Sequence, residues 1–219
     1  MHALIIGASG ATGKDLLEQL LADDSVERVD IFVRRSPGFS HSKLVVYVVN
    51  FDDSDSWKEK VKGDVLFSCL GTTLKAAGSK QAQWKVDYEY QYAFAEAAKG
   101  NGIPSLVLIS ADMASPDSRL FYSRMKGQLE KAVKALQFTR LHIFNPPLLV
   151  RKNTDRGGEK LAKNVLNWLN AIGLFRSQRP LPTTKLAKAM IRAAKIKEPG
   201  VFHYRGKQIR ALAGDGVVK

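Results

Sequence analysis

The chain has 219 residues, 45% of them apolar. This length suits one α/β domain that buries roughly two-thirds to three-quarters of its unfolded surface, and it leaves no room for a second domain of full size. Cys69 is the only cysteine, which excludes an internal disulfide. The 34 basic and 21 acidic residues give a net charge of +13, a balance that suits an anionic ligand.

The distribution of charge and apolar residues narrows the class of protein further. The basic residues are scattered over many segments and are not interleaved with aromatic residues, so we do not expect nucleic acid as a partner. No apolar run approaches the ~18–20 residues that a membrane helix needs. The first residues also lack the basic flank and apolar stretch of a signal peptide. We therefore expect no membrane contact and a cytoplasmic location.

The chain opens with an apolar run over residues 3–6, which predicts a strand buried on both faces. Three glycines follow it directly, and a helix is predicted over residues 10–22. In such an arrangement Gly7 makes the tight turn, Gly10 lets a pyrophosphate approach the backbone, and Gly13 lets the helix pack on the strand. The helix N-terminus adds free N–H groups. We expect a dinucleotide site here, with an ordinary turn as the alternative; its residues are Gly7, Ser9, Gly10, Ala11, Thr12 and Gly13.

The next two strands are predicted at residues 28–33 and 44–49. An NAD site usually carries an acid at the end of its second strand, to bond the ribose 2′-hydroxyl. Arg34 and Arg35 stand there instead, and guanidinium groups suit a 2′-phosphate. We therefore predict NADP(H), against the alternative of two solvent-facing arginines. Asp52, after the third strand, is expected to flank the adenine, although aspartate is also a common turn residue.

A fourth strand is predicted at residues 64–68, a helix at 83–99, a fifth strand at 105–110 and a long helix at 118–136. Ser110 ends the fifth strand, where open α/β sheets bind ligands. Tyr122 and Lys126 lie one turn apart on one face of the long helix. A nearby ammonium lowers the pKa of a phenol. We expect Tyr122 to exchange a proton with the substrate oxygen and Ser110 to bond that oxygen.

The last third of the chain changes character. A strand over residues 138–144 stops at a pair of prolines, and its His142 is expected to be a packed core residue rather than a ligand. Helices are predicted at 159–171 and 184–194, the second with Thr183 as its N-cap, and a short strand at 201–204. We expect residues 1–219 to form a single NAD(P)-binding domain, in which 151–219 form a small cap on the substrate side. The apolar run from Trp168 to Phe175 fits the core of that cap better than a lid or dimer surface.

At its motifs the chain resembles an atypical short-chain dehydrogenase/reductase, closest to the Tat-interacting-protein branch that groups with nucleoside-diphosphate-sugar epimerase-like proteins. The resemblance covers roughly residues 1–196 and rests on five segments. They are Gly7-Ala8-Ser9-Gly10-Ala11-Thr12-Gly13, Cys69-Leu70-Gly71-Thr72-Thr73, Val86-Asp87, Ser110-Ala111-Asp112, and Tyr122 to Lys126-Gly127.

The resemblance implies a Rossmann fold, NADP(H) binding and a catalytic set of Ser110, Tyr122 and Lys126, with Lys126 also holding the cofactor ribose. It implies that Cys69, Leu70, Gly71 and Thr72 line the nicotinamide end, and that residues 144–148 close over it. Two positions depart from the family. Many members carry a second serine at position 111 and an arginine at position 145, where this chain has Ala111 and Asn145.

The sequence thus predicts an α/β protein with a doubly wound parallel Rossmann sheet and a small C-terminal cap. Its expected activity is that of an NADP(H)-dependent oxidoreductase acting on a small carbonyl or alcohol substrate, with Tyr122 as the proton donor or acceptor. The alternative is a non-catalytic NADP(H)-binding regulator that senses redox state and binds a protein partner. No histidine or cysteine spacing suits a metal, and a homodimer is left open.

Overall fold

The computed structural model describes residues 1–150 and 180–214. At its centre lies a seven-stranded sheet in the order β3-β2-β1-β4-β5-β6-β9, in which every neighbouring pair is parallel. This is the doubly wound Rossmann sheet that the sequence predicts. The strands are β1 His2–Ile6, β2 Arg28–Val33, β3 Leu44–Val48, β4 Val65–Ser68, β5 Ser105–Ile109, β6 Arg140–Asn145 and β9 Gly200–Arg205. The strands β7 Leu149–Val150 and β8 Leu181–Pro182 form a separate parallel pair.

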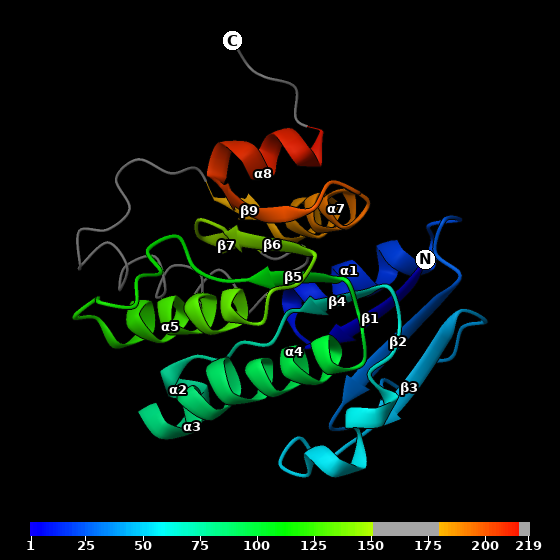
Figure 1. Ribbon diagram of the computed structural model, residues 1–219, viewed down its shortest axis with the longest axis horizontal. Coiled ribbons are helices and arrows are strands. Elements are labelled where there is room, and N and C mark those ends of the chain that lie inside the picture. Colours follow the sequence, from blue (N-terminus) through cyan, green and yellow to red (C-terminus); the bar gives the residue numbers. More distant parts are fainter. Residues whose placement is uncertain (151–179, 215–219) are drawn as a thin grey trace, which may run out of the picture.

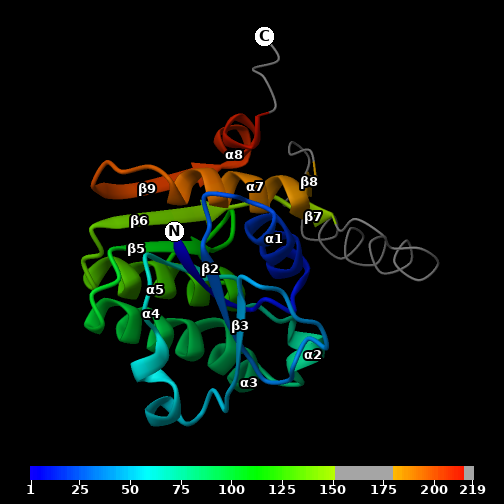
Figure 2. The same ribbon diagram turned by 90° about the vertical axis from the view of Figure 1, so that its right-hand side faces the viewer.

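Helices cover both faces of the sheet. Figures 1 and 2 show α4 and α5 side by side on one face and α1 and α7 on the other. The α8 helix packs on α7 beyond the β9 edge. The longer helices are α1 Ala11–Leu21, α4 Tyr90–Gly100, α5 Phe121–Ala135, α7 Thr183–Ala194 and α8 Gly206–Ala213. Short pieces precede α4, namely the turns Ser54–Ser56 and Lys58–Lys60, α2 Leu74–Ala77 and α3 Lys80–Trp84. None of the described helices is long and apolar enough to cross a membrane.

The alternation of side chains along β1 divides the core into two layers. Ala3 and Ile5 join the cluster under α1 and α7, whereas Leu4 and Ile6 join the cluster under α4 and α5. All four side chains are fully buried. Burial of each larger aliphatic side chain contributes about 1.5–3 kcal/mol, so the central strand contributes to both layers at once. A continuous apolar run of this kind is what a strand covered on both faces requires.

The helix predicted at residues 83–99 is interrupted by one π-helical segment, Lys85–Glu89, between α3 and α4. The inner face of the combined helix carries three buried polar side chains at four-residue spacing: Gln83, Asp87 and Gln91. Gln91 ties the segment down, because its Nε2 donates to the Asp87 carbonyl at 2.7 Å and its Oε1 accepts from Ser68 Oγ at 2.7 Å. The π segment therefore fixes Asp87 below the carboxyl end of β4, and such segments are frequent at functional sites.

The described part of the tail extends the sheet. β9 pairs with β6 along its whole length, and α7 packs on α1. With β9 beside it, β6 is as buried as a central strand. The cap predicted over residues 151–219 falls partly outside the described residues and stays a prediction. Thr183 is the first residue of α7 rather than its N-cap, which is Pro182. The predicted helix at 159–171 and the run from Trp168 to Phe175 lie outside the described residues.

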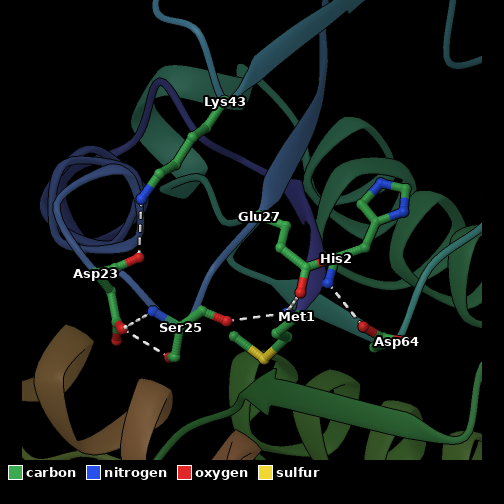
Figure 3. Close-up of polar contacts among 7 residues, drawn as sticks. All are labelled: Met1, His2, Asp23, Ser25, Glu27, Lys43 and Asp64. Carbon is green, nitrogen blue, oxygen red and sulfur yellow. Dashed lines mark hydrogen bonds and ion pairs between the residues drawn. The ribbon is translucent and has the colours of Figure 1, made fainter.

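The amino edge of the sheet is held by structural polar contacts, drawn in Figure 3. The amine of Met1 donates to the carbonyl of Ser25 at 2.9 Å, and the backbone N–H of His2 donates to Asp64 Oδ2 at 2.7 Å. Lys43 Nζ donates to the carbonyl of Asp23 at 3.0 Å. These bonds join the starts of β1, β2, β3 and β4, so the functional side chains must be sought at the opposite, carboxyl edge.

Candidate functional site

The glycine turn between β1 and α1 has the geometry of a phosphate-binding loop. Gly7 has a φ of +82°, and its carbonyl accepts the backbone N–H of Gly10 at 2.9 Å. Gly10 is the N-cap of α1 and makes no side-chain capping bond. The first N–H groups of the helix are therefore uncapped by any side chain and form a ready site for an anion.

The three glycines are required for different reasons. A Cβ on Gly7 would lie 2.5 Å from the carbonyl carbon of Cys69, and one on Gly13 would lie 2.1 Å from the Gly7 oxygen. Both are therefore demanded by packing within the protein. A Cβ on Gly10 would meet only the Gly7 oxygen at 3.2 Å and that of Cys69 at 3.9 Å. Because the fold nearly tolerates a side chain at Gly10, its bare backbone is best explained by a ligand that approaches there.

A cleft of about 1140 Å³ opens beside the glycine turn. It exists because the β2–β3 connection, residues 34–43, contains no helix to cover the sheet next to α1. Arg34 and Arg35 line this cleft together with Ala8 and Ser9 of the turn. Their binding of a 2′-phosphate stays a prediction. Lys14 of α1 adds a third cation that the sequence analysis missed. Its position one residue after Gly13 was the available signal.

Asp52 lies apart from this cleft among the described residues. Its Oδ1 forms an ion pair with Lys85 Nζ at 2.6 Å and accepts the Tyr90 hydroxyl at 2.8 Å. Hydrogen bonding to Lys85, then to Tyr90, lowers the pKa of Asp52. The carboxylate is thus already engaged by α4 and the π segment. A role beside the adenine stays a prediction.

The loop after β4 runs directly against the glycine turn. The Cys69 N–H donates to the Ile6 carbonyl at 2.9 Å, and the contact that forbids a side chain on Gly7 comes from Cys69 and Leu70. Thr72 donates its backbone N–H to Asp87 Oδ2 at 2.8 Å. Burial raises the pKa of the Cys69 thiol. The Cys69–Thr72 segment therefore borders the turn, but through packing rather than through a reactive thiolate.

Lys126 and Asp87 form a buried ion pair at the carboxyl edge. Lys126 Nζ lies 3.2 Å from Asp87 Oδ1, and both side chains are almost entirely inaccessible to water. The pair lacks hydrogen-bond geometry, since Oδ1 has no hydrogen-bond partner among the described residues. The Lys126 ammonium therefore keeps its N–H donors for another acceptor, such as a ribose hydroxyl.

Tyr122 keeps 44% of its surface exposed, which leaves the ring open to a ligand. Its pKa is raised, mainly because the phenol is desolvated; Lys126 acts to lower it and Asp87 to raise it. Lys126 thus acts in the direction expected from the sequence, but desolvation outweighs it and Asp87 opposes it. In this resting state Tyr122 is a protonated phenol and can donate a proton more readily than accept one.

Ser110 is fixed by a carboxylate that the sequence analysis missed. Its Oγ donates to Glu130 Oε1 at 2.5 Å, and Asn145 Nδ2 donates to the same oxygen at 2.7 Å. Glu130 follows Lys126 by one turn of α5, as Lys126 follows Tyr122, so the four-residue spacing was the signal for it. Since its hydroxyl proton is donated to Glu130, Ser110 offers a ligand only its lone pairs.

The structure thus brings Tyr122, Lys126 and Asp87 into one electrostatic group and joins Ser110 to the same helix through Glu130. It does not bring Phe144 over the edge, because that ring is fully buried against Tyr204, 4.7 Å between centroids. Within residues 1–150 and 180–214, no cluster of His, Cys, Asp and Glu could hold a metal ion.

Comparison with known proteins identifies relatives along the whole chain. A family model described as NAD(P)H-binding matches residues 7–141. The protein named FMP52, mitochondrial, of Meyerozyma guilliermondii is 32% identical over 97% of this chain and 95% of its own length. The FMP52 protein of Candida albicans is 29% identical over 100% of this chain and 97% of its own length. The FMP52 protein of Eremothecium gossypii is 40% identical over 68% of this chain and 67% of its own length.

Solved structures support the epimerase-like resemblance at the level of the fold. MoeE5 in complex with UDP-glucose and NAD superposes with a TM-score of 0.69 and 14% identity over 99% of this chain and 82% of its own. The UDP-glucose 4-epimerase of Thermotoga maritima superposes with a TM-score of 0.70 and 12% identity over 98% of this chain and 81% of its own. These identities establish a shared Rossmann-like architecture.

The relatives also overturn one expectation. We predicted a cytoplasmic location because the chain shows no signal peptide and no membrane span. The relatives from Meyerozyma guilliermondii, Candida albicans and Saccharomyces cerevisiae are all named as mitochondrial proteins, so the cytoplasmic prediction is wrong. Composition and apolar runs report on secretion and membrane insertion, and they carry no information about the choice between cytoplasm and mitochondrion.

Proposed function

The chain belongs to the NAD(P)H-binding family and shares it with the fungal FMP52 proteins, and on this premise we propose that it is an NADP(H)-dependent oxidoreductase of the short-chain dehydrogenase/reductase type. Its proposed substrate is a small carbonyl or alcohol compound. The observation that carries the proposal is the buried Lys126, whose N–H groups have no hydrogen-bond acceptor among the described residues, one turn from a half-exposed Tyr122. We further propose that it resides in mitochondria, as the names of its relatives state of them.

The cofactor is proposed to lie along the carboxyl edge of the sheet. The uncapped N–H groups after Gly10 would hold the pyrophosphate, and Lys14, Arg34 and Arg35 would surround the 2′-phosphate. Lys126 would donate to the ribose hydroxyls at the other end. When bound, the nicotinamide supplies the chemistry of hydride transfer.

The residues of this chain would then manage the substrate oxygen. Tyr122 would donate its phenol proton to that oxygen during reduction and take it back during oxidation. Desolvation keeps the phenol protonated, and Lys126 stabilises the phenolate that forms. Ser110 would accept a hydrogen bond from a substrate hydroxyl, because its own hydroxyl proton is already donated in a hydrogen bond to Glu130.

A second candidate is a non-catalytic protein that binds NADP(H) and reports its state to a protein partner. It is favoured by the self-contained polar network, in which Ser110 is already bonded to Glu130 and Lys126 already paired with Asp87. A raised pKa of Tyr122 points the same way, since it makes the phenol a weaker acid and leaves little phenolate to act as a base at neutral pH. The two candidates predict the same cofactor but different turnover.

One pair of measurements tests the proposal. Calorimetric titration should show NADPH binding more tightly than NADH, and Arg34→Ala/Arg35→Ala should abolish that difference without changing NADH affinity. Turnover of carbonyl compounds with NADPH should fall by about 10²–10⁴-fold in Tyr122→Phe, the usual contribution of a positioned proton donor. Tyr92→Phe, a change on the surface of α4, is the matched control.

The outcomes separate the alternatives. Equal affinity for NADPH and NADH would remove the argument from the arginines. Tight binding of NADPH with no turnover of any compound would favour the regulator.

A further inference from the structure

Glu130 is a buried carboxylate with no cation bound to it among the described residues. Only 8% of the residue is exposed, and its recorded contacts are the hydroxyl of Ser110 and the amide of Asn145. Both donate to Oε1, as they would to an ionised carboxylate. A buried charge is normally paired, so one held only by neutral dipoles at a candidate active site requires an explanation.

The neighbouring charges do not neutralise it. Lys126, one turn earlier on α5, is paired with Asp87. His203 lies near, its Nδ1 3.5 Å from Asn145 Oδ1. Burial and then Lys134 lower its pKa, Glu130 acts to raise it, and Arg205 lowers it; the net shift is downward, so the ring is neutral at neutral pH. The opposite charges of Asp87 and Lys126 cancel each other. The buried group formed by Asp87, Lys126 and Glu130 therefore carries one net negative charge.

We propose that the Glu130 carboxylate biases the site toward the oxidised cofactor, whose nicotinamide ring is cationic, over the reduced cofactor, whose ring is neutral. This inference rests on the proposed function, because it requires the nicotinamide to lie beside Ser110 and Lys126. A negative charge in a poorly hydrated site stabilises a nearby cation far more than it would in water. On the substrate side Ser110 favours the matching partner, since with its proton donated to Glu130 it can accept a hydrogen bond from an alcohol but cannot donate one to a carbonyl.

The test compares two ligands that differ by one hydride on the nicotinamide ring and therefore in the charge of that ring. Dissociation constants of NADP⁺ and NADPH are measured by calorimetry at neutral pH for the unmodified protein and for Glu130→Gln. The glutamine keeps the shape and an acceptor oxygen but removes the charge. The ratio of the two constants should shift against NADP⁺ by about tenfold, the effect of one charge across about 12 Å at an effective dielectric constant near 20.

Two control variants isolate the charge. Glu130→Asp keeps the carboxylate and should keep most of the preference. Glu198→Gln makes the same charge change at an exposed position before β9, at the amino edge, and should leave the ratio unaltered. If Glu130→Gln does not fold, Asn145→Lys offers a second route, since an ammonium beside Oε1 compensates the charge and should shift the ratio in the same direction.

The failure of this inference is distinguishable from failure of the proposed function. If the unmodified protein binds neither NADP⁺ nor NADPH, the proposed function is wrong and the inference falls with it. If both ligands bind and the ratio is the same in Glu130→Gln or Asn145→Lys, the charge of Glu130 has no role in cofactor choice and only the inference is overturned.

Discussion

At the scale of single residues, the Lys126–Asp87 pair decides what Tyr122 can do. An isolated buried ammonium beside a phenol would lower its pKa strongly, whereas a paired one exerts a weaker field. The carboxylate of Asp87 both holds Lys126 in the protein and opposes its effect on Tyr122. The ion pair therefore holds Lys126 in a fixed position, and as a consequence the pKa of Tyr122 is lowered less in the resting state.

The ion pair yields a prediction about stability. Asp87→Asn should destabilise the protein by about 3–5 kcal/mol, because it leaves the Lys126 charge buried without a partner. The double variant Asp87→Asn/Lys126→Met should cost clearly less than the sum of the single changes. Urea unfolding of the unmodified protein, Asp87→Asn, Lys126→Met and the double variant measures this coupling. Lys195→Met removes an exposed ion pair with Asp23 and should cost only about 0–1 kcal/mol. A cost of Asp87→Asn as small as that of Lys195→Met would contradict the account.

At the scale of elements, the β1–α1 turn combines two glycines that packing requires with a third, Gly10, that packing does not require. A Cβ on Gly7 or Gly13 would overlap backbone atoms, whereas a Cβ on Gly10 would meet only two carbonyl oxygens, the nearer at 3.2 Å. A turn at this place that bound no ligand would need glycine only at positions 7 and 13. The asymmetry between Gly10 and Gly13 is therefore a test of the dinucleotide site that does not depend on any substrate.

Gly10→Ala and Gly13→Ala form a matched pair for that test. Gly10 has an extended backbone, so alanine there should change the unfolding free energy by no more than about 1 kcal/mol. The new Cβ should nevertheless weaken NADPH binding by about tenfold or more, that is about 1.4 kcal/mol or more. Gly13→Ala should destabilise the protein by about 1–3 kcal/mol or more, since its Cβ would overlap the Gly7 carbonyl. Calorimetry and thermal unfolding report the two effects, and full NADPH affinity in Gly10→Ala would exclude the proposed site.

At the scale of the whole molecule, β9 near the end of the chain adds the last strand to the sheet. β9 joins β6, and the rings of Phe202 and Tyr204 stack on His142 at centroid distances of 5.0 and 5.9 Å. His142 is fully buried, its Nδ1 lies 3.1 Å from the Tyr204 hydroxyl, and its Nε2 has no partner among the described residues. The prediction that His142 is a packed core residue is confirmed, and its pKa couples the fold to pH.

This coupling predicts an acid sensitivity of the entire fold. Burial lowers the pKa of His142 from 6.5 to about 4, so the unfolded chain binds a proton that the folded chain refuses. Stability should therefore be full above about pH 6.5 and fall between about pH 6.5 and 4, by about 2 kcal/mol at pH 5. Urea unfolding at pH 7.5 and pH 5 measures the loss. His142→Phe should remove most of this pH dependence, and an unchanged slope in that variant would assign the sensitivity to other groups.

The order of elements and the glycine turn could be predicted because they rest on local physics. Apolar runs of four to six residues mark buried strands, and Gly7, Gly10 and Gly13 lie three residues apart within one short segment. Lys126 and Tyr122 share a helix face, so their proximity needed no tertiary information. The role of residues 200–205 could not be predicted, because strand order depends on which side of β6 is left open after folding.

By itself, the sequence determined the Rossmann architecture, the location of the glycine turn and the helix that carries Tyr122 and Lys126, since each depends on residues close together in the chain. Only the tertiary structure decided the partners of the reactive groups: Asp87 for Lys126, Glu130 for Ser110, and Lys14 beside Arg34 and Arg35. Burial and charge balance arise when separate elements meet, and they set the protonation of Tyr122 and the net charge of the site. A linear pattern can name the groups, but their ionisation depends on what the folded chain places around them.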